Sequence, residues 1–349
     1  MIKSARFQNF TTLPNDNLRF APGLNVVIAE NGLGKTHLLK ALYSILKVNA
    51  SGSGELTKTA LQREYAEKLV RVFRADTLGR LVKRKQGRER CELAVEMRRA
   101  DQSCAINFAS QAVNSVQIDQ LPTARPEKSP VFLPTRELLT LCPWFVPLYD
   151  NYHVEFEESW RDTCSLLGAP GLRGARSTVV AKLLGRLEEA MGGKVIVDGQ
   201  TGRFYLQIPG EGKLEMPLVA EGLRKVAMLA RLVSTGELLE QGCLFWDEPE
   251  ANLNPKLIKV IAASIMVLCS QGVQVFMATH SLFLLRELEM LASRPDLATV
   301  AQRYFSLKAS QHGVELEQGD SVEDLETLVL LDEELKQSDR FMGMEPDNG

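Results

Sequence analysis

The sequence predicts an α/β fold with a mostly parallel sheet and an inserted lobe of helices and strands. Apolar strands alternate with amphipathic helices near both ends of the chain, and the middle lacks this rhythm. The strands are near-continuous apolar runs, which is typical of parallel strands covered on both faces. With 349 residues, 45% of them hydrophobic, the chain can bury one large core or two modest ones.

Composition excludes several classes of protein. The net charge of −3 argues against a nucleic-acid binder that uses its whole surface, although local patches remain possible. Six scattered cysteines without a C-x-x-C pair indicate reduced thiols rather than a disulfide framework or zinc site. No apolar run approaches the ~18 residues that span a bilayer, and the first residues begin a strand rather than a signal peptide. We therefore expect a soluble, cytoplasmic protein that makes no membrane contact.

The first elements surround a glycine-bearing loop. Strands are expected over residues 2–10, 18–20 and 24–28, the last of them buried. The loop is followed by Lys35-Thr36 and a helix with apolar residues at helical spacing. Strand, glycine-bearing loop, Lys-Thr and helix is the arrangement of a phosphate-binding P-loop, so the fold is expected to be that of a P-loop NTPase.

Each part of this loop has a chemical task. Gly32 and Gly34 let the backbone curl so that its N–H groups point at a phosphate. Lys35 would reach the outer phosphates, and the Thr36 hydroxyl can hold Mg²⁺. Ala29 is a mismatch, because it occupies the first position of the P-loop pattern, where glycine is usual, and alanine does not take positive φ cheaply.

A basic segment follows a helix expected over residues 59–76. The segments 91–97 and 103–108 alternate like half-buried strands. One hypothesis is a basic hairpin that faces DNA, and the other is a solvated edge whose charges discourage strand pairing. The basic residues between Arg80 and Arg99 are Arg80, Lys83, Arg84, Lys85, Arg88, Arg90, Arg98 and Arg99.

The middle of the chain lacks the strand–helix alternation of both ends, which predicts a second lobe inserted over residues 137–214. Before it, a short apolar strand in 129–137 is stopped by proline and leaves polar residues at its carboxyl end. Helices are expected over 155–168 and 177–192, followed by a hairpin of 194–197 with 203–208.

The strand–helix rhythm returns after Pro217. Helices are expected over 221–240 and 255–270, and buried strands over 242–246 and 273–278. Open parallel sheets bind ligands beyond the carboxyl ends of their strands. Asp247, Glu248 and His280 come at such ends.

These three residues suit the second half of a nucleotide site. Asp247 can order the water around Mg²⁺, and Glu248 could act as general base toward the attacking water. His280 can contact a γ-phosphate. The structural alternatives are an acidic loop that caps the next helix and a histidine beside a helix cap at Thr279 or Ser281. The order of P-loop, Asp-Glu and Thr-His-Ser along one chain favours the functional interpretation.

With these motifs in place, the sequence resembles ABC-type ATPases of the SMC, RecF and OLD class. More closely, it resembles the small stand-alone AAA_15 and AAA_21 ATPases of bacterial defence and toxin-linked operons. The residues that carry the resemblance are Glu30 to Thr36, Phe132 to Glu137, Glu221 to Lys225, Trp246 to Pro255 and Ala278 to Ser281.

The resemblance implies a role for each motif. Lys35 and Thr36 would be the Walker A pair, Asp247 and Glu248 the Walker B pair, and His280 the switch histidine. Arg136 or Glu137 stands where a Q-loop lies, without its glutamine. Glu221-Gly222 stands where a signature motif opens a helix, without the usual serine, and Asn252 to Asn254 would be the D-loop. The residues expected to bind ATP are Glu30, Asn31, Gly32, Leu33, Gly34, Lys35, Thr36, His37, Arg136, Glu221 and Gly222, with Thr36 and Asp247 as Mg²⁺ ligands.

The resemblance also implies an organisation. Residues 1–136 and 215–310 would form an ABC-ATPase-like head with a basic β insertion around 80–110, the lobe would lie within it, and 311–349 would be an acidic tail. Two copies would sandwich two ATP molecules, each P-loop facing the Glu221-Gly222 helix of its partner. Closure of this dimer would require the γ-phosphate, and hydrolysis would release that phosphate, so that ATP biases a bistable dimer.

Three functions stay open. No stretch sustains the heptads of SMC arms, and the residues after His280 form an acidic amphipathic stretch rather than a nuclease domain. We therefore expect an ATPase that controls a separate effector, a nuclease or toxin, in antiphage defence. The acidic stretch is either a solvated helix or a docking surface for a basic partner. The alternatives are a RecF/SMC-like DNA-repair ATPase that uses Arg80–Arg99 and, with less support, the ATPase subunit of an ABC transporter.

Overall fold

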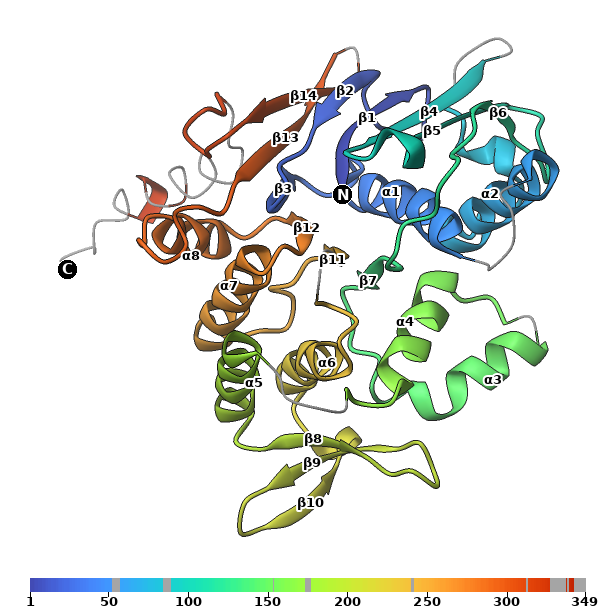
Figure 1. The fold of residues 1–349 in the computed structure, drawn as a ribbon. Coiled ribbons are helices and arrows are strands. Elements are labelled where there is room, and N and C mark those ends of the chain that lie inside the picture. Colours follow the sequence, from blue (N-terminus) through green and yellow to red (C-terminus); the bar gives the residue numbers. More distant parts are fainter. Residues whose placement is uncertain are drawn as a thin grey trace, which may run out of the picture.

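The computed structural model describes residues 1–51, 57–83, 89–152, 154–172, 177–239, 242–311, 313–326, 337 and 339–341. Its centre is a six-stranded sheet in the order β14-β13-β3-β12-β11-β7 (Figure 1). Every pair in it is parallel except the antiparallel β13–β14. The strands are β3 (Leu24–Ala29), β7 (Val131–Leu133), β11 (Cys243–Asp247), β12 (Gln274–Thr279), β13 (Gln302–Ser310) and β14 (Gly313–Gly319). The predicted α/β fold with a mostly parallel sheet is confirmed.

A second sheet is antiparallel, in the order β2-β1-β4-β5-β6. Its strands are β1 (Ile2–Gln8), β2 (Asp16–Arg19), β4 (Arg90–Met97), β5 (Cys104–Ala109) and β6 (Gln117–Gln120). The strands predicted at 91–97 and 103–108 are therefore confirmed, and β4 pairs directly with β1 near the start of the chain. Arg84, Lys85 and Arg88 of the basic segment lie outside the described residues.

Helices cover both faces of the central sheet (Figure 1). On the side of the antiparallel sheet lie α1 (Lys35–Ala50) and α2 (Lys58–Phe73). On the opposite side lie α5 (Thr178–Met191), α6 (Glu221–Thr235), α7 (Pro255–Ser270) and α8 (Leu282–Ala292). Short 3-10 helices cover Leu78–Leu81, Ala100–Gln102 and Met216–Leu218.

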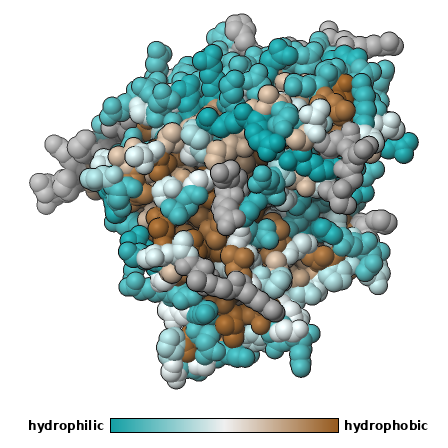
Figure 2. Space-filling view, viewed as in Figure 1, coloured by the Kyte–Doolittle hydropathy of each residue, from teal (hydrophilic) through white to brown (hydrophobic). Residues whose placement is uncertain are grey.

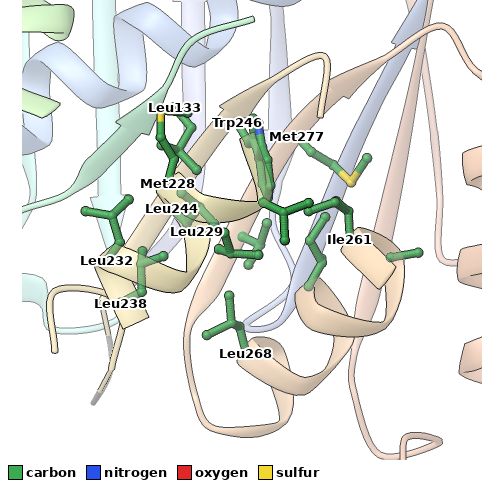
Figure 3. Close-up of a cluster of buried hydrophobic side chains, with 14 of the residues drawn as sticks. Leu133, Met228, Leu229, Leu232, Leu238, Leu244, Trp246, Ile261, Leu268 and Met277 are labelled. Atoms are coloured by element: carbon green, nitrogen blue, oxygen red, sulfur yellow. The ribbon is translucent and has the colours of Figure 1, made fainter. Parts of the chain in front are cut away.

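Successive residues of the central strands enter opposite cores. Trp246 and Met277 belong to the core shared with α6 and α7 (Figure 3). Phe245 and Phe276, the residues before them, belong to the core shared with α1, and their rings stack with centroids 4.9 Å apart. Because both faces are buried, the inner positions of these two strands are apolar on both sides, and their polar residues, Gln274, Asp247 and Thr279, lie at strand ends.

The middle of the chain contains α3 (Cys142–Tyr152), α4 (Glu158–Gly168) and a small sheet of β8 (Lys194–Val197), β9 (Phe204–Ile208) and β10 (Gly212–Glu215). Asp162 of α4 ties this region to the first helices. Its Oδ2 accepts hydrogen bonds from the Tyr43 hydroxyl at 2.7 Å and from Lys68 Nζ at 2.6 Å. The division into a head and an inserted lobe stays a prediction.

Several element boundaries differ from the predictions for local reasons. Helix α2 ends at Phe73 because Arg74 takes φ 53, and α6 ends at Thr235 because Gly236 takes φ 83. The sequence analysis did not predict α3, which contains Pro147, nor β10. Strand β14 lies in the range that was expected to be an acidic tail, and it pairs with β13.

Figure 2 shows hydrophilic side chains over the upper part of this view, above the antiparallel sheet, and apolar patches lower down, among the helices. None of the helices in the described part of the chain is both long enough and apolar enough to cross a bilayer.

Candidate functional site

Four loops meet at one edge of the central sheet. The P-loop follows β3, residues 134–137 follow β7, Asp247-Glu248 end β11, and Thr279-His280 end β12. These strands are parallel neighbours, so their carboxyl ends lie together. We call Lys35, Thr36, Asp247, Glu248 and His280 the strand-end site.

The P-loop has the backbone that phosphate binding requires. Gly32 and Gly34 take φ 85 and 101, and a Cβ on Gly34 would lie 2.7 Å from Thr12 Oγ1. Ala29 ends β3 and has no positive φ, so the alanine in place of glycine causes no strain. Helix α1 has no side-chain cap and no acidic residue in its first turn, which leaves its N–H groups available to an anion.

Lys35 is almost completely buried at the base of this loop. Its Nζ donates hydrogen bonds to Ala29 O at 2.6 Å and Glu30 O at 3.1 Å. Burial lowers the pKa of the Lys35 ammonium, and the carboxylates of Glu248 and Asp247 oppose this shift. The ammonium therefore lies between the phosphate loop and the acidic residues of β11.

Thr36 and Asp247 face each other across the site. The Thr36 hydroxyl lies 3.0 Å from Asp247 Oδ1 and 2.9 Å from Oδ2, to which it donates. Burial raises the pKa of Asp247 to about 6, although the Thr36 hydrogen bond acts in the opposite direction.

A hydroxyl and a buried carboxylate are oxygen donors of the kind that Mg²⁺ prefers. The cation would relieve the cost of the buried charge, so these residues fit it. Among the described residues, no three His, Cys, Asp or Glu side chains group as a metal site of their own.

Glu248 and His280 form the other pair. His280 Nδ1 lies 3.2 Å from Glu248 Oε1, and Glu248 has the left-handed φ of 47. Glu250 holds the histidine loop in place, since its Oε1 accepts hydrogen bonds from Thr279 Oγ1 at 2.6 Å and from His280 N at 3.1 Å.

The structural alternatives were that the acidic loop caps the next helix and that His280 lies beside a helix cap. The observed helix caps test both. Asn254 caps α7 by accepting from Leu257 N, so Asp247 and Glu248 do not serve as that cap. Ser281 does cap α8, by accepting from Leu284 N, so His280 lies beside a helix cap and at the strand-end site as well.

The remaining residues expected to bind ATP differ in burial and in their contacts. Glu30 and Asn31 are exposed, and the His37 ring lies 5.5 Å from Phe73 with its pKa lowered by burial. Arg136 is exposed and makes no hydrogen bond or ion pair with the residues that the structure describes. Its neighbour Glu137 is buried, with Oε1 3.0 Å from Arg224 Nε.

The start of α6 contacts the loop after Asp247-Glu248 rather than the P-loop of the same chain. Glu221 Oε1 accepts a hydrogen bond from Asn252 Nδ2 at 3.0 Å. Gly222 packs so closely that a Cβ there would lie 2.8 Å from Asn252 O. The binding of nucleotide by Glu221, Gly222 and Arg136 stays a prediction.

Two further residues at this edge of the sheet, Lys225 and Glu250, were assigned no role from the sequence. Lys225 Nζ donates to Glu248 O at 2.9 Å and to Ala251 O at 3.0 Å. The signal for it was present, because position 225 lies one helical turn before apolar Leu229, where a charge on the buried face needs partners.

Comparisons with known proteins agree with this geometry. Residues 108–286 match the AAA_21 family model, described as "AAA domain, putative AbiEii toxin, Type IV TA system". The match includes β11, β12 and their carboxyl ends, whereas the P-loop precedes it. No protein of curated function matches the sequence.

Many solved structures are similar in fold, among them two SMC heads. One is an SmcHead bound to the C-winged helix domain of ScpA, with TM-score 0.57, 12% identity and coverage of 92% of this chain and 98% of that chain. The other is an Smc head domain with an extended coiled coil, bound to the C-terminal domain of ScpA and derived from Pyrococcus furiosus. Its TM-score is 0.53 at 11% identity, and the match covers 98% of this chain and 99% of that chain.

Proposed function

This chain belongs to the AAA_21 family and has the fold of an SMC head, and on that premise we propose that it binds Mg²⁺-ATP at the strand-end site and hydrolyses it. The observation that carries the proposal is the meeting of Lys35, Thr36, Asp247, Glu248 and His280 at adjacent strand ends. A phosphate loop, a metal-binding carboxylate and a free carboxylate base are the parts that phosphoryl transfer to water requires.

Each residue then has one task. The N-terminus of α1 and the Lys35 ammonium hold the phosphates, and Thr36 with Asp247 would hold Mg²⁺. When bound, Mg²⁺ neutralises charge on the phosphate oxygens. Glu248 accepts a proton from the attacking water, and His280 orients the Glu248 carboxylate through the 3.2 Å contact.

We further propose that two copies close around ATP. Helix α6 begins at Glu221 without a side-chain cap, so its N–H groups can meet the γ-phosphate of a partner's nucleotide. The absence of the usual serine then costs one hydroxyl contact and leaves the backbone donors in place.

For the biological role, we propose control of an effector on a separate chain in antiphage defence. The description of the AAA_21 family, which names a toxin and a Type IV TA system, supports this proposal. The SMC heads that share the fold are bound to ScpA in their structures, which supports a protein partner for this head as well.

A DNA-binding role for the segment from Arg80 to Arg99 has less support from the side chains. Arg80 lies 3.6 Å from Asp76, and Arg99 lies 2.9 Å from Asp101. Arg90 donates to Asn107 Oδ1 at 3.2 Å and Gln117 Oε1 at 2.8 Å. The two aspartates neutralise charge that phosphate contacts would need, and the two amide oxygens occupy N–H donors of Arg90.

The test of nucleotide binding is Lys35→Ala, measured by equilibrium titration with ATP. We expect at least about a tenfold loss of affinity, because a charge-assisted contact to phosphate disappears. The control is Lys47→Ala on the same helix, whose Nζ bonds to Ser129 Oγ at 2.8 Å, away from the loop. Equal ATP affinity in Lys35→Ala and the wild type would refute the assignment of the site.

A further inference from the structure

Lys225 is a completely buried lysine on α6. Its Nζ lies 2.9 Å from Glu248 O, 3.0 Å from Ala251 O and 3.5 Å from Pro249 O. An ammonium group has three N–H donors and no acceptor, so three carbonyl oxygens satisfy its full hydrogen-bonding capacity. Because an unpaired buried charge is very costly, these carbonyl oxygens and the nearby carboxylates of Glu250 and Glu248 must offset its burial.

The segment that the ammonium holds has an unusual backbone. Glu248 and Asn252 both take positive φ, 47 and 62, although neither is glycine. Such conformations persist where the surroundings over-determine them. The turn from 248 to 252 directs carbonyl oxygens toward α6, and Glu248 O accepts from both Lys225 Nζ and Ala251 N.

The first two residues of helix α6 also touch this turn. A Cβ on Gly222 would lie 2.8 Å from Asn252 O, and Glu221 accepts a hydrogen bond from Asn252 Nδ2. The first two turns of α6 and residues 248–252 therefore form one packed unit. Glu248 belongs to this unit through its backbone and to the strand-end site through its carboxylate.

We propose that Lys225 is a positioning residue for Glu248, which fixes the turn so that the carboxylate faces the nucleotide site. The inference rests on the proposed function, in which Glu248 is the general base. Lys225 acts through main-chain oxygens and touches no substrate. It also makes the position of the base depend on α6, the helix proposed to meet the nucleotide of a second copy.

Helix α6 offers a matched control for the test. Arg231 lies farther along the helix and also donates to main-chain oxygens, Leu167 O at 2.9 Å and Ala169 O. Lys225→Met and Arg231→Met thus remove the same kind of interaction from one helix. Only Lys225→Met removes it from the turn that carries Glu248.

We expect Lys225→Met to lower kcat for ATP hydrolysis about 10- to 100-fold, the cost of a base displaced by a fraction of an ångström to an ångström. Its Kd for ATP should stay within about threefold of the wild type, because Lys35 and Thr36 are untouched. Arg231→Met should keep kcat within about twofold. Lys225→Arg, which retains the donors, should recover part of the lost rate. Equal kcat values in Lys225→Met and the wild type would overturn the inference.

Amide hydrogen exchange tests the positioning role of Lys225 without a measurement of ATP hydrolysis. We expect faster amide exchange in residues 248–253 of Lys225→Met and unchanged exchange there in Arg231→Met. If wild-type protein hydrolyses no ATP, the proposed function fails, whereas this measurement still tests Lys225. Unchanged exchange in Lys225→Met would contradict the positioning role.

Should Lys225→Met fail to fold, Gly222→Ala provides the second variant. Its new Cβ would press on Asn252 O and displace the same turn while the lysine stays in place. The measurement for this variant is amide exchange, because Gly222 opens the helix that is proposed to meet a partner's nucleotide. We expect faster exchange in residues 248–253 than in the wild type, and unchanged exchange there in a folded Gly222→Ala protein would count against the packed unit.

Discussion

His280 Nδ1 lies 3.2 Å from Glu248 Oε1, and the two residues follow adjacent parallel strands, β12 and β11. The contact joins the candidate base to the loop that Glu250 holds through Thr279 Oγ1 and His280 N. This pair links the strand-end site to the rest of the fold.

Replacing His280 should separate catalysis from binding. We expect His280→Ala to lower kcat about tenfold or more, because Glu248 loses the group that orients its carboxylate. The Kd for ATP should change little, since Lys35 and Thr36 are intact. Steady-state hydrolysis and calorimetric titration measure the two quantities.

Ser281→Ala is the control for this variant. It removes the cap of α8 one residue away and should cost about 1 kcal/mol of stability, with little effect on kcat. A loss of rate as large in Ser281→Ala as in His280→Ala would show that the His280–Glu248 contact is not the cause.

The raised pKa of Asp247 predicts that the stability of the protein depends on pH when neither nucleotide nor Mg²⁺ is bound. Its pKa is raised from 3.8 to about 6, so the folded state favours the protonated carboxyl. The contribution of this group to stability is present below pH 4 and is lost as pH rises through about 6. The loss is at most about 3 kcal/mol.

Asp247→Asn should therefore raise Tm at pH 8 in metal-free buffer, and its advantage should shrink as pH falls from 6 to 4. Asp296→Asn, at an exposed carboxylate, is the control. Thermal unfolding followed by circular dichroism at several pH values measures the difference. An Asp247→Asn protein that is less stable than the wild type at pH 8 would contradict the raised pKa.

The buried hydrogen bonds of Asp162 join α4 to α1 and α2, and we expect them to contribute to the free energy of unfolding. Asp162→Ala removes the partner of Lys68 Nζ at 2.6 Å and of the Tyr43 hydroxyl at 2.7 Å. Lys68 keeps Glu158 Oε1 at 2.6 Å, so the change removes one of its two carboxylate partners and leaves the buried Tyr43 hydroxyl unpaired. We therefore expect the free energy of unfolding to fall by about 2 kcal/mol.

An exposed pair of the same chemistry is available for comparison. Arg294 Nη2 lies 2.8 Å from Asp296 Oδ2 at the surface, and Asp296→Ala should cost no more than about 1 kcal/mol. Denaturant titrations of the two variants test the contrast. Similar midpoints would mean that the Asp162 network does not anchor α4.

The residues of the strand-end site could be identified from the sequence because each comes shortly after a strand with an unmistakable apolar run. Phosphate and metal chemistry restricts the choice further, so Lys35, Thr36, Asp247 and Glu248 stood out. Ala29 seemed a departure from the pattern, but its position needs no positive φ.

The position of Lys225 on the buried face of α6 indicates that its charge needs partners, but the sequence could not identify them, because they are main-chain oxygens. Strand β14 was also missed, since only two apolar residues, Val314 and Leu316, alternate there with glutamates, which is too short a run to stand out. Helix α3 was missed for a different reason, because Pro147 lies inside it.

The most direct test of the central claim is size-exclusion chromatography of Glu248→Gln with Mg²⁺-ATP. Removing the general base should slow hydrolysis about 100-fold or more while the phosphate contacts of Lys35 and Thr36 remain. The account predicts that this variant elutes as a dimer with Mg²⁺-ATP and as a monomer without nucleotide. A Glu248→Gln protein that binds ATP yet elutes as a monomer at saturating Mg²⁺-ATP would contradict it.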